Sequence, residues 1–313
     1  MPLFLVVFLY AAWSSVFALG KWTLEHSPPL FLTASRMLFA AVILLTYLAI
    51  RNRAALKINL RQLMGIALLG FLNIYLANAL EFWGLHQMSA AKTCFFYSLT
   101  PFFTALFSYI HFKEKMNRRK WLGMVIGFTG FIPVLLGQKG SEELLSSLTF
   151  LSWPELAIIG ATISASYGWI LLRLLVKNQE TSSLMANGSS MLIGGAMALV
   201  HSIIVDTWHP IPVALDQIAP FAQGLLFMTL ISNILCYNLY GYLLTRFTAT
   251  FVSFMGLLSP LFASLNAWIL LGETPSPIIF LSTAIVSAGL WLIYSAELKQ
   301  GYIRQTEENA IAT

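Results

Sequence analysis

Long apolar runs, separated by short polar stretches, extend along the whole sequence. A helix needs about 20 apolar residues to cross the hydrocarbon core of a bilayer. Ten segments approach or exceed this length: residues 3–20, 30–50, 63–82, 90–110, 121–137, 153–173, 184–205, 218–241, 249–270 and 277–296. The connections between them are too short for a soluble domain. The pattern therefore predicts an all-α integral membrane protein with ten transmembrane helices.

The composition agrees with this prediction. Of the 313 residues, 58% are hydrophobic and only 10% are charged, whereas soluble proteins have about 25% charged residues. The same values exclude an intrinsically disordered chain. The basic residues lie between apolar segments, so the net charge of +5 indicates membrane orientation and no nucleic-acid partner.

Basic residues gather on one predicted side of the membrane. Of the 18 Lys and Arg residues, 14 follow the second, fourth, sixth and eighth segments or lie in the C-terminal tail: Arg51, Arg53, Lys57, Arg61, Lys113, Lys115, Arg118, Arg119, Lys120, Arg173, Lys177, Arg246, Lys299 and Arg304. The positive-inside rule then places both termini on the cytoplasmic side of the membrane, which we expect to be a bacterial inner membrane. The alternative that the first segment is a cleaved signal peptide stays open, because residues 17–20 resemble a cleavage site.

An internal duplication divides the chain. Residues 90–114 align with residues 249–273 at an offset of 159, which pairs Pro101 with Pro260 and, further on, Gly130 with Gly289. We therefore expect two repeats, residues 1–140 and 150–298, followed by a cytoplasmic tail, residues 299–313. Five spans per repeat is an odd number, so the second repeat is inverted. Inverted repeats are typical of secondary transporters.

The paired prolines are candidate pivots. A proline within a span removes one backbone hydrogen bond and can kink the helix. Pro101 and Pro260 are therefore predicted to be symmetric kinks, either moving parts of a gate or static bends that shape a cavity.

These features resemble the drug/metabolite transporter superfamily, EamA type. The resemblance rests on residues 271–273 (Leu-Gly-Glu) after the proline-containing helix, on Arg36 in the second span and on the five-plus-five layout. It implies a secondary transporter with a central cavity between its repeats. Two positions depart from the family pattern: residues 112–114 read Phe-Lys-Glu, and Ser189 and Ser190 stand where a counterpart of Arg36 is expected.

Polar residues recur on matching faces of the third and eighth spans. At the repeat offset Asn78 meets Tyr237 and Glu81 meets Tyr240, and Asn233 shares the face of the two tyrosines. Polar groups in a membrane are costly and tend to face a cavity or another helix. We expect these residues to line a substrate cavity, with hydrogen bonds between helices as the alternative.

Glu81 and Lys92 are candidate receptors for the two ends of a zwitterionic substrate. The alternatives are that they pair with each other or extend to the membrane interface. Glu81 is also a candidate proton-coupling group. Arg36 is expected either to bond backbone carbonyls of its own span or to contact an anionic group.

Aromatic side chains are candidates for stacking on a planar ring, with ordinary helix packing as the alternative. Those predicted to bind substrate are Trp13, Phe17, Phe95, Phe96, Tyr167 and Phe254, in addition to Tyr237 and Tyr240.

The sequence thus predicts a secondary transporter of a small zwitterionic metabolite, an amino acid or an S-adenosylmethionine-like compound, which works by alternating access. Proton coupling and substrate exchange both stay open. The alternative is an exporter of hydrophobic drugs or waste metabolites. An enzyme or channel is disfavoured because no phosphate loop, His-Glu-x-x-His motif, Gly-x-Ser-x-Gly motif or potassium filter is present.

No catalytic residue, metal or cofactor is expected. The expected partners are a small-molecule substrate and the lipid bilayer. Gly123 and Gly127 form a small-residue face that suits close helix packing or a dimer contact, so both a monomer and a homodimer stay open.

Overall fold

The computed structural model describes residues 2–88, 93, 96, 97, 99–136, 152–177, 181–259, 261, 262 and 277–300. These residues are helical with short connections, and no strand occurs among them. Six continuous helical stretches within this part of the chain are long and apolar enough to cross a membrane: residues Leu3–Leu24, Pro29–Arg51, Leu60–Gln87, Trp153–Val176, Ser183–Val205 and Leu215–Leu244. The described part of the chain is therefore all-helical, and the protein is a membrane protein.

Each of the ten predicted segments overlaps a helix, although ten complete spans stay a prediction. The α-helices are α1 (Pro2–Leu24), α2 (Pro29–Arg51), α3 (Leu60–Leu69), α4 (Ala77–Gln87), α6 (Thr100–Phe112), α7 (Arg118–Leu136), α9 (Trp153–Val176), α10 (Ser183–Val205), α11 (Ile218–Met228), α12 (Tyr237–Leu244), α13 (Ala249–Met255) and α15 (Pro277–Lys299). Short helical turns lie at η1 (Arg53–Leu56), η3 (Leu215–Gln217) and η5 (Gly256–Leu258).

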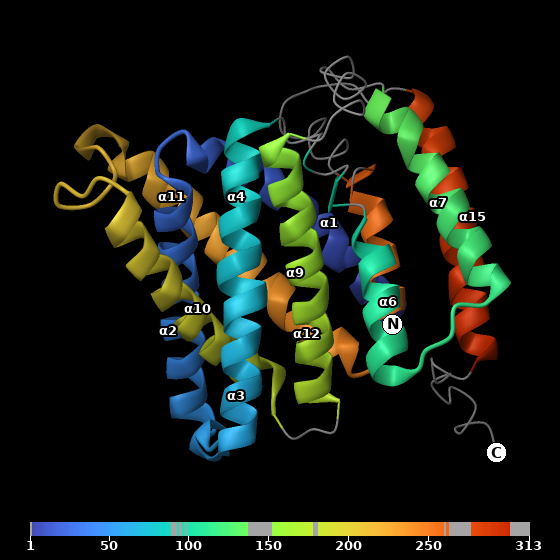
Figure 1. Cartoon of the computed structure of the whole chain (residues 1–313), viewed down its shortest axis with the longest axis horizontal. Coiled ribbons are helices and arrows are strands. Elements are labelled where there is room, and N and C mark those ends of the chain that lie inside the picture. Colours follow the sequence, from blue (N-terminus) through green and yellow to red (C-terminus); the bar gives the residue numbers. More distant parts are fainter. Residues whose placement is uncertain are drawn as a thin grey trace.

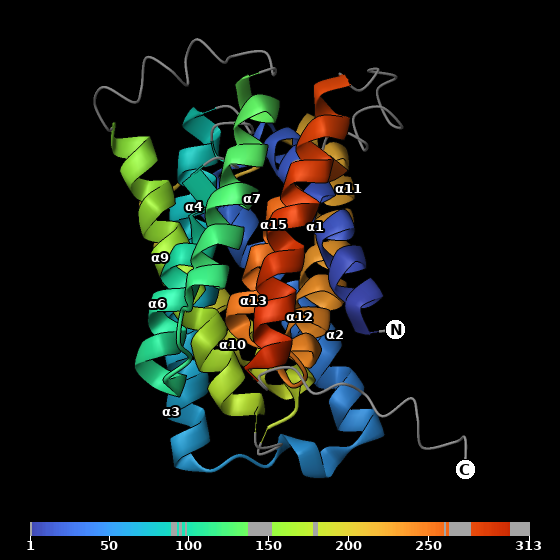
Figure 2. The same cartoon turned by 90° about the vertical axis from the view of Figure 1, so that its right-hand side faces the viewer.

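Two helix pairs form opposite edges of the bundle. The pair α2 and α10 packs at one edge, and the pair α7 and α15 packs at the other (Figures 1 and 2). Between these edges, α1 contacts α11, α12 and α13, while α9 contacts α3, α4 and α6. The centre of the bundle is thus enclosed by helices from both halves of the chain.

Glycines allow the α7–α15 pair to approach closely. A Cβ atom added to Gly123 would lie 2.6 Å from the carbonyl oxygen of Gly289, and one added to Gly289 would lie 2.7 Å from the backbone nitrogen of Gly127. The predicted small-residue face therefore packs against α15 of the same chain, as is common where membrane helices meet.

Two π-helical segments interrupt the long helices. Segment η2 (Gly70–Leu76) joins α3 to α4, and segment η4 (Thr229–Cys236) joins α11 to α12. π-Helical turns are rare and often mark functional sites. Their first residues are 159 positions apart, which is the offset of the predicted repeat.

An asparagine follows each π-helical segment and bonds its carbonyls. The Asn78 amide nitrogen donates to the carbonyl oxygens of Asn73 and Ile74, both at 2.9 Å. The sequence Asn-Ile-x-x-x-Asn recurs at residues 233–238, where the Asn238 amide donates to the carbonyls of residues 233 and 234 at 3.4 and 2.8 Å. This motif has an offset of 160, whereas the sequence on both sides of it has an offset of 159.

Two ion pairs join helices at the end of the bundle where α6 ends and α7 begins. Glu114 contacts Arg173 of α9 at 2.6 Å. Lys120 of α7 contacts Glu297 of α15 at 2.5 Å, and the Thr248 hydroxyl donates to the second oxygen of that carboxylate. All four charged side chains are buried. The basic-residue pattern predicts that this end faces the cytoplasm.

We expect Lys120→Met to lower the free energy of unfolding by about 3–5 kcal/mol, because it leaves the Glu297 carboxylate, which is 0% exposed, without its cation. The midpoint of thermal unfolding in detergent micelles measures this loss. Lys299→Met, at an exposed position of α15, is the matched control. The double variant Lys120→Met/Glu297→Gln should recover part of the loss. Equal midpoints for wild type and Lys120→Met would contradict this assignment.

The end of α6 explains one departure from the family pattern. Lys113 is the residue that caps this helix, with φ 56° and ψ 28°, the left-handed conformation. Glycine adopts that conformation without steric strain and is favoured after helix ends. Gly272, the residue aligned with Lys113 in the second half, is glycine, and it lies outside the described residues.

We expect Lys113→Gly to raise the free energy of unfolding by about 1 kcal/mol, since it removes the strain of a left-handed lysine. Lys113→Ala retains a Cβ atom and should give no such gain. The midpoint of thermal unfolding of wild type and the two variants in one detergent measures the effect. An equal gain in stability from both substitutions would contradict the prediction, because it would show that the lysine side chain, and not the backbone conformation, causes the strain.

Candidate functional site

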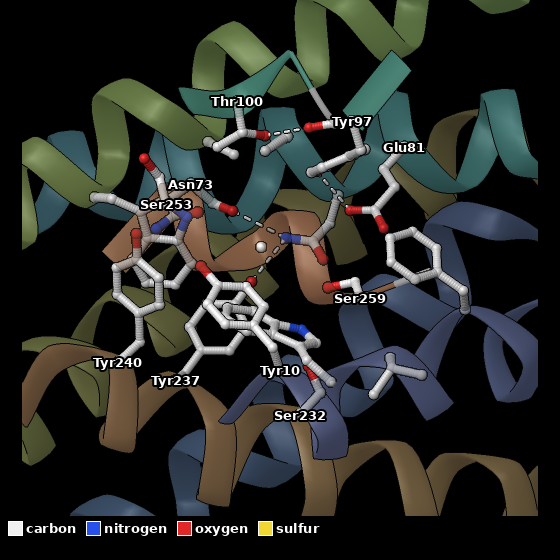
Figure 3. A pocket seen from close by; sticks show the side chains of 18 of the residues that line it. Tyr10, Asn73, Glu81, Tyr97, Thr100, Ser232, Tyr237, Tyr240, Ser253 and Ser259 are labelled. Carbon is white, nitrogen blue, oxygen red and sulfur yellow. Dashed lines mark hydrogen bonds between the residues drawn. The ribbon is translucent and has the colours of Figure 1, made fainter. Parts of the chain in front are cut away.

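A cavity of about 140 Å³ lies at the centre of the bundle (Figure 3). Its walls come from α1, α2, η2, α4, α6, α9, η4, α12, α13 and η5, together with Tyr97 and Ser259. The cavity is therefore shared by both halves of the chain.

One wall carries a buried hydrogen-bond network. The Arg36 Nη2 atom donates to Asn78 Oδ1, and the Asn78 amide nitrogen also lies 3.4 Å from the Tyr237 hydroxyl oxygen. The guanidinium carbon of Arg36 lies 4.7 Å from the centre of the Phe82 ring. Arg36 thus bonds a cavity side chain, whereas the sequence suggested backbone carbonyls or an anionic group as its partner.

The acidic group of the cavity is Glu81, one α-helical turn beyond Asn78. The Tyr97 hydroxyl donates to Glu81 Oε2 at 2.8 Å, and the Tyr97 ring packs edge-on against Phe17, with 6.0 Å between ring centres. In Figure 3, Glu81 and Tyr97 lie together on one side of the cavity.

Aromatic rings gather on the other side. In Figure 3, Tyr237 and Tyr240 lie away from the Glu81 carboxylate, with Tyr10 beside them. The Trp13 ring centre lies 5.7 Å from those of Trp169 and Tyr237. The Trp169 and Tyr240 ring centres are 4.1 Å apart. All five rings line the cavity.

Six of the predicted binding residues line the cavity: Trp13, Phe17, Asn78, Glu81, Tyr237 and Tyr240. Two predicted residues, Lys92 and Phe95, lie outside the described residues. The contribution of all these residues to binding stays a prediction.

Four other predicted residues pack elsewhere. Phe96 is buried in a cluster with Met88 and Ile158. Tyr167 packs against His111, with ring centres 5.4 Å apart. Phe254 is buried in the main core.

The fourth residue, Asn233, is turned from the cavity by the π-helical segment. Its amide nitrogen approaches the Met37 sulfur at 2.8 Å, and Ser232 lines the cavity instead. A π-helix has more residues per turn than an α-helix, so Asn233 does not share the face of Tyr237 and Tyr240. The spacing of residues 233, 237 and 240 places them on one face only in a regular α-helix.

Pro101 also lines the cavity, but it lies in the first turn of α6. Proline is favoured there because its missing N–H has no helical partner in any case. Pro101 thus begins a helix after the turn at Leu99. Its predicted counterpart Pro260 lies outside the described residues, and a gating role for either stays a prediction.

Several residues that line the cavity were not predicted from the sequence to bind substrate. Arg36 was a candidate only through its charge, and Tyr10, Asn73, Trp169, Thr100 and Ser253 were not selected. One available signal was the offset itself, because Tyr10 and Trp169 are 159 residues apart, as are Asn73 and Ser232. Within the described residues no three His, Cys, Asp or Glu side chains gather as a metal site would require.

Comparisons with known proteins agree on a transporter. A model of the EamA-like transporter family matches residues 1–136 and again residues 152–295. A Chlamydia trachomatis protein named "S-adenosylmethionine/S-adenosylhomocysteine transporter" is 39% identical over 98% of this chain and 93% of its own. A Chlamydia muridarum protein of the same name is 38% identical over 98% and 96%.

More distant similarities extend over the same length. The Escherichia coli protein named "Uncharacterized inner membrane transporter YedA" is 26% identical over 94% of this chain and 90% of its own. A crystal structure with 14% sequence identity covers 95% of this chain and 96% of its own with a TM-score of 0.74, which shows a shared fold.

We expect Asn238→Leu to lower the free energy of unfolding by about 1–2 kcal/mol, because membrane helices need a partner for each backbone carbonyl that lacks one within the helix. Asn238 lies outside the cavity lining, so ligand binding should persist. Thermal unfolding in detergent provides the measurement, with the exposed substitution Asn52→Leu as control. A variant as stable as wild type would contradict this role.

Proposed function

Because the chain belongs to the EamA-like transporter family, we propose that it is a secondary transporter of S-adenosylmethionine and S-adenosylhomocysteine. The two Chlamydia relatives that carry this function in their names match almost the whole chain. We place the protein in a bacterial cytoplasmic membrane, with both termini in the cytoplasm in accordance with the distribution of its basic residues.

This substrate is supported by the way in which charged and aromatic lining residues are divided between the two halves of the chain. Both charged groups, Arg36 and Glu81, come from the first half of the chain, whereas Tyr237 and Tyr240 occupy the second-half positions that align with Asn78 and Glu81. S-Adenosylmethionine has a zwitterionic amino-acid end and an adenine ring. A cavity that combines two charged groups with a cluster of five aromatic rings matches both ends of such a molecule.

The aromatic side suits the adenosine and the sulfonium. Tryptophan and tyrosine rings stack on planar rings and attract cations placed over their faces. Trp13 contacts three of the other four rings at 5.7–5.8 Å between centres, so a ring inserted beside it meets a continuous aromatic surface.

The proposed architecture is ten helices in two inverted repeats. Six pairs of lining residues are separated by 159 positions: Tyr10 and Trp169, Asn73 and Ser232, Asn78 and Tyr237, Glu81 and Tyr240, Tyr97 and Gly256, and Thr100 and Ser259. The two family-model matches divide the chain at the same place. Exchange of the halves also maps the contacts of α1 with α11 and α12 onto those of α9 with α3 and α4.

The size of the cavity supports alternating access. Its volume of about 140 Å³ is below the 300–1,000 Å³ or so of pockets that enclose drug-sized ligands. Substrate entry therefore requires the helices to separate. At the predicted cytoplasmic end, one ion pair joins Glu114 to α9 and the other joins α7 to α15. We propose that these pairs break when the transporter opens inward.

The charged lining disfavours the alternative of an exporter for hydrophobic drugs. Such a cavity needs no fixed charges, and a charged side chain within a membrane is expensive to keep. The transporter relatives and the absence of a recognisable catalytic motif favour a carrier over an enzyme. We propose exchange as the transport mode, because the two compounds share both ends and differ only in the methyl group and its positive charge.

We expect purified protein in liposomes loaded with S-adenosylhomocysteine to take up labelled S-adenosylmethionine, with saturation and with loss of uptake when the internal compound is omitted. Protein-free liposomes and liposomes loaded with glutamate are the controls. Binding of S-adenosyl compounds is measured separately by calorimetry in detergent. The proposal is overturned if the protein neither binds nor takes up any S-adenosyl compound. If uptake instead depends on an imposed proton gradient, proton coupling replaces exchange as the transport mode.

A further inference from the structure

Arg36 has more hydrogen-bonding capacity than the fold uses. The side chain is 2% exposed and lines the cavity. Its Nη2 atom bonds Asn78, whereas Nε and Nη1 have no hydrogen-bond partner among the described residues. A buried guanidinium with unsatisfied donors is costly in a membrane protein, which points to a ligand.

The second half of the chain shows what the fold itself requires at this position. There Asn238 has the place of Asn78 in the recurring motif, and its Oδ1 atom accepts a hydrogen bond from the amide of Asn187 in α10 at 3.1 Å. Asn187 is thus the structural counterpart of Arg36, in place of the serines that follow it. A neutral amide suffices to hold one motif, so the charge of Arg36 exceeds the structural need.

We propose that Arg36 binds the carboxylate of the substrate's amino-acid end through its unsatisfied N–H groups. This inference rests on the proposed function and assigns a specificity-determining residue within it. Either Nε or Nη1, together with the Nη2 hydrogen that Asn78 does not use, forms a planar fork. Such a fork matches the two oxygens of a carboxylate in a way that a lysine does not. Arg36 thus takes the carboxylate-binding role that the sequence suggested for Lys92.

Two neighbours complete the recognition. Glu81 lines the same cavity one turn along α4 from Asn78 and has an oxygen beyond the one that Tyr97 occupies, which suits the substrate ammonium. The Tyr240 hydroxyl has no hydrogen-bond partner among the described residues either. It is available for a polar atom of the adenosine end, at the aromatic side of the cavity.

The test compares ligands that differ only in the carboxylate. We measure binding of S-adenosylmethionine and of decarboxylated S-adenosylmethionine to the purified full chain by calorimetry. Hydrogen bonds to a charged group contribute about 10- to 100-fold in affinity, so wild type should prefer the carboxylated ligand by this factor. Arg36→Gln should lose that preference, and Arg36→Lys should retain only part of it.

Arg36→Gln is chosen because a glutamine can still donate to Asn78, as Asn187 does to Asn238. Its folding is checked by thermal unfolding, and Glu81→Gln serves as the matched cavity control. Glu81→Gln should weaken both ligands equally, since both contain the ammonium group.

The outcomes separate this inference from the proposed function. Loss of the carboxylate preference in Arg36→Gln, with the affinity for the decarboxylated ligand changed less than about threefold, supports the inference. Equal weakening of both ligands, or an unchanged preference, overturns it and leaves the transporter function intact. If wild type binds no S-adenosyl compound at all, the proposed function and this inference are both overturned.

Discussion

The amide of Asn78 is the interaction on which the central part of the structure depends. A π-helical segment changes which backbone carbonyls find partners within the helix, and the bilayer supplies no water to replace them. Asn78 bonds two such carbonyls with its nitrogen and presents its oxygen to Arg36. One side chain thus joins a backbone irregularity to a buried charge. The position of the charge in the cavity follows from the need to satisfy the helix.

The equivalent asparagine in the second half shows which part of this arrangement the fold itself requires. Asn238 satisfies its own π-helical segment and takes its partner from a neutral amide. The two halves therefore share the backbone solution and differ in the groups around it. A gene duplication with inversion would give a symmetric cavity, whereas a substrate with one zwitterionic end and one aromatic end is asymmetric. Restricting the charges to one half reconciles a symmetric fold with such a substrate.

The sequence predicts the membrane class, the helical segments and much of the central lining for physical reasons. Apolar runs and a repeat offset are one-dimensional signals, and Asn78, Glu81, Tyr237 and Tyr240 were found by combining them. Asn233 was misplaced because a π-helix shifts the residues that share a face, and periodicity of 3.6 residues contains no mark of it. The role of Arg36 depends on a partner 42 positions away, which no local pattern reveals.

The ion pairs at the predicted cytoplasmic end place a further demand on transport. Glu114 and Arg173, together with Lys120 and Glu297, are buried in this conformation, and an isolated buried ion is far more costly than a pair. An inward-opening motion that separates these partners must therefore admit water to both sides of each pair as it breaks them. In the binding mode that we propose, the substrate carboxylate and ammonium pair with Arg36 and Glu81 and compensate these two charges. Under this proposal, a filled cavity would lower the electrostatic cost of closing the opposite end and would couple movement of the helices to occupancy of the site.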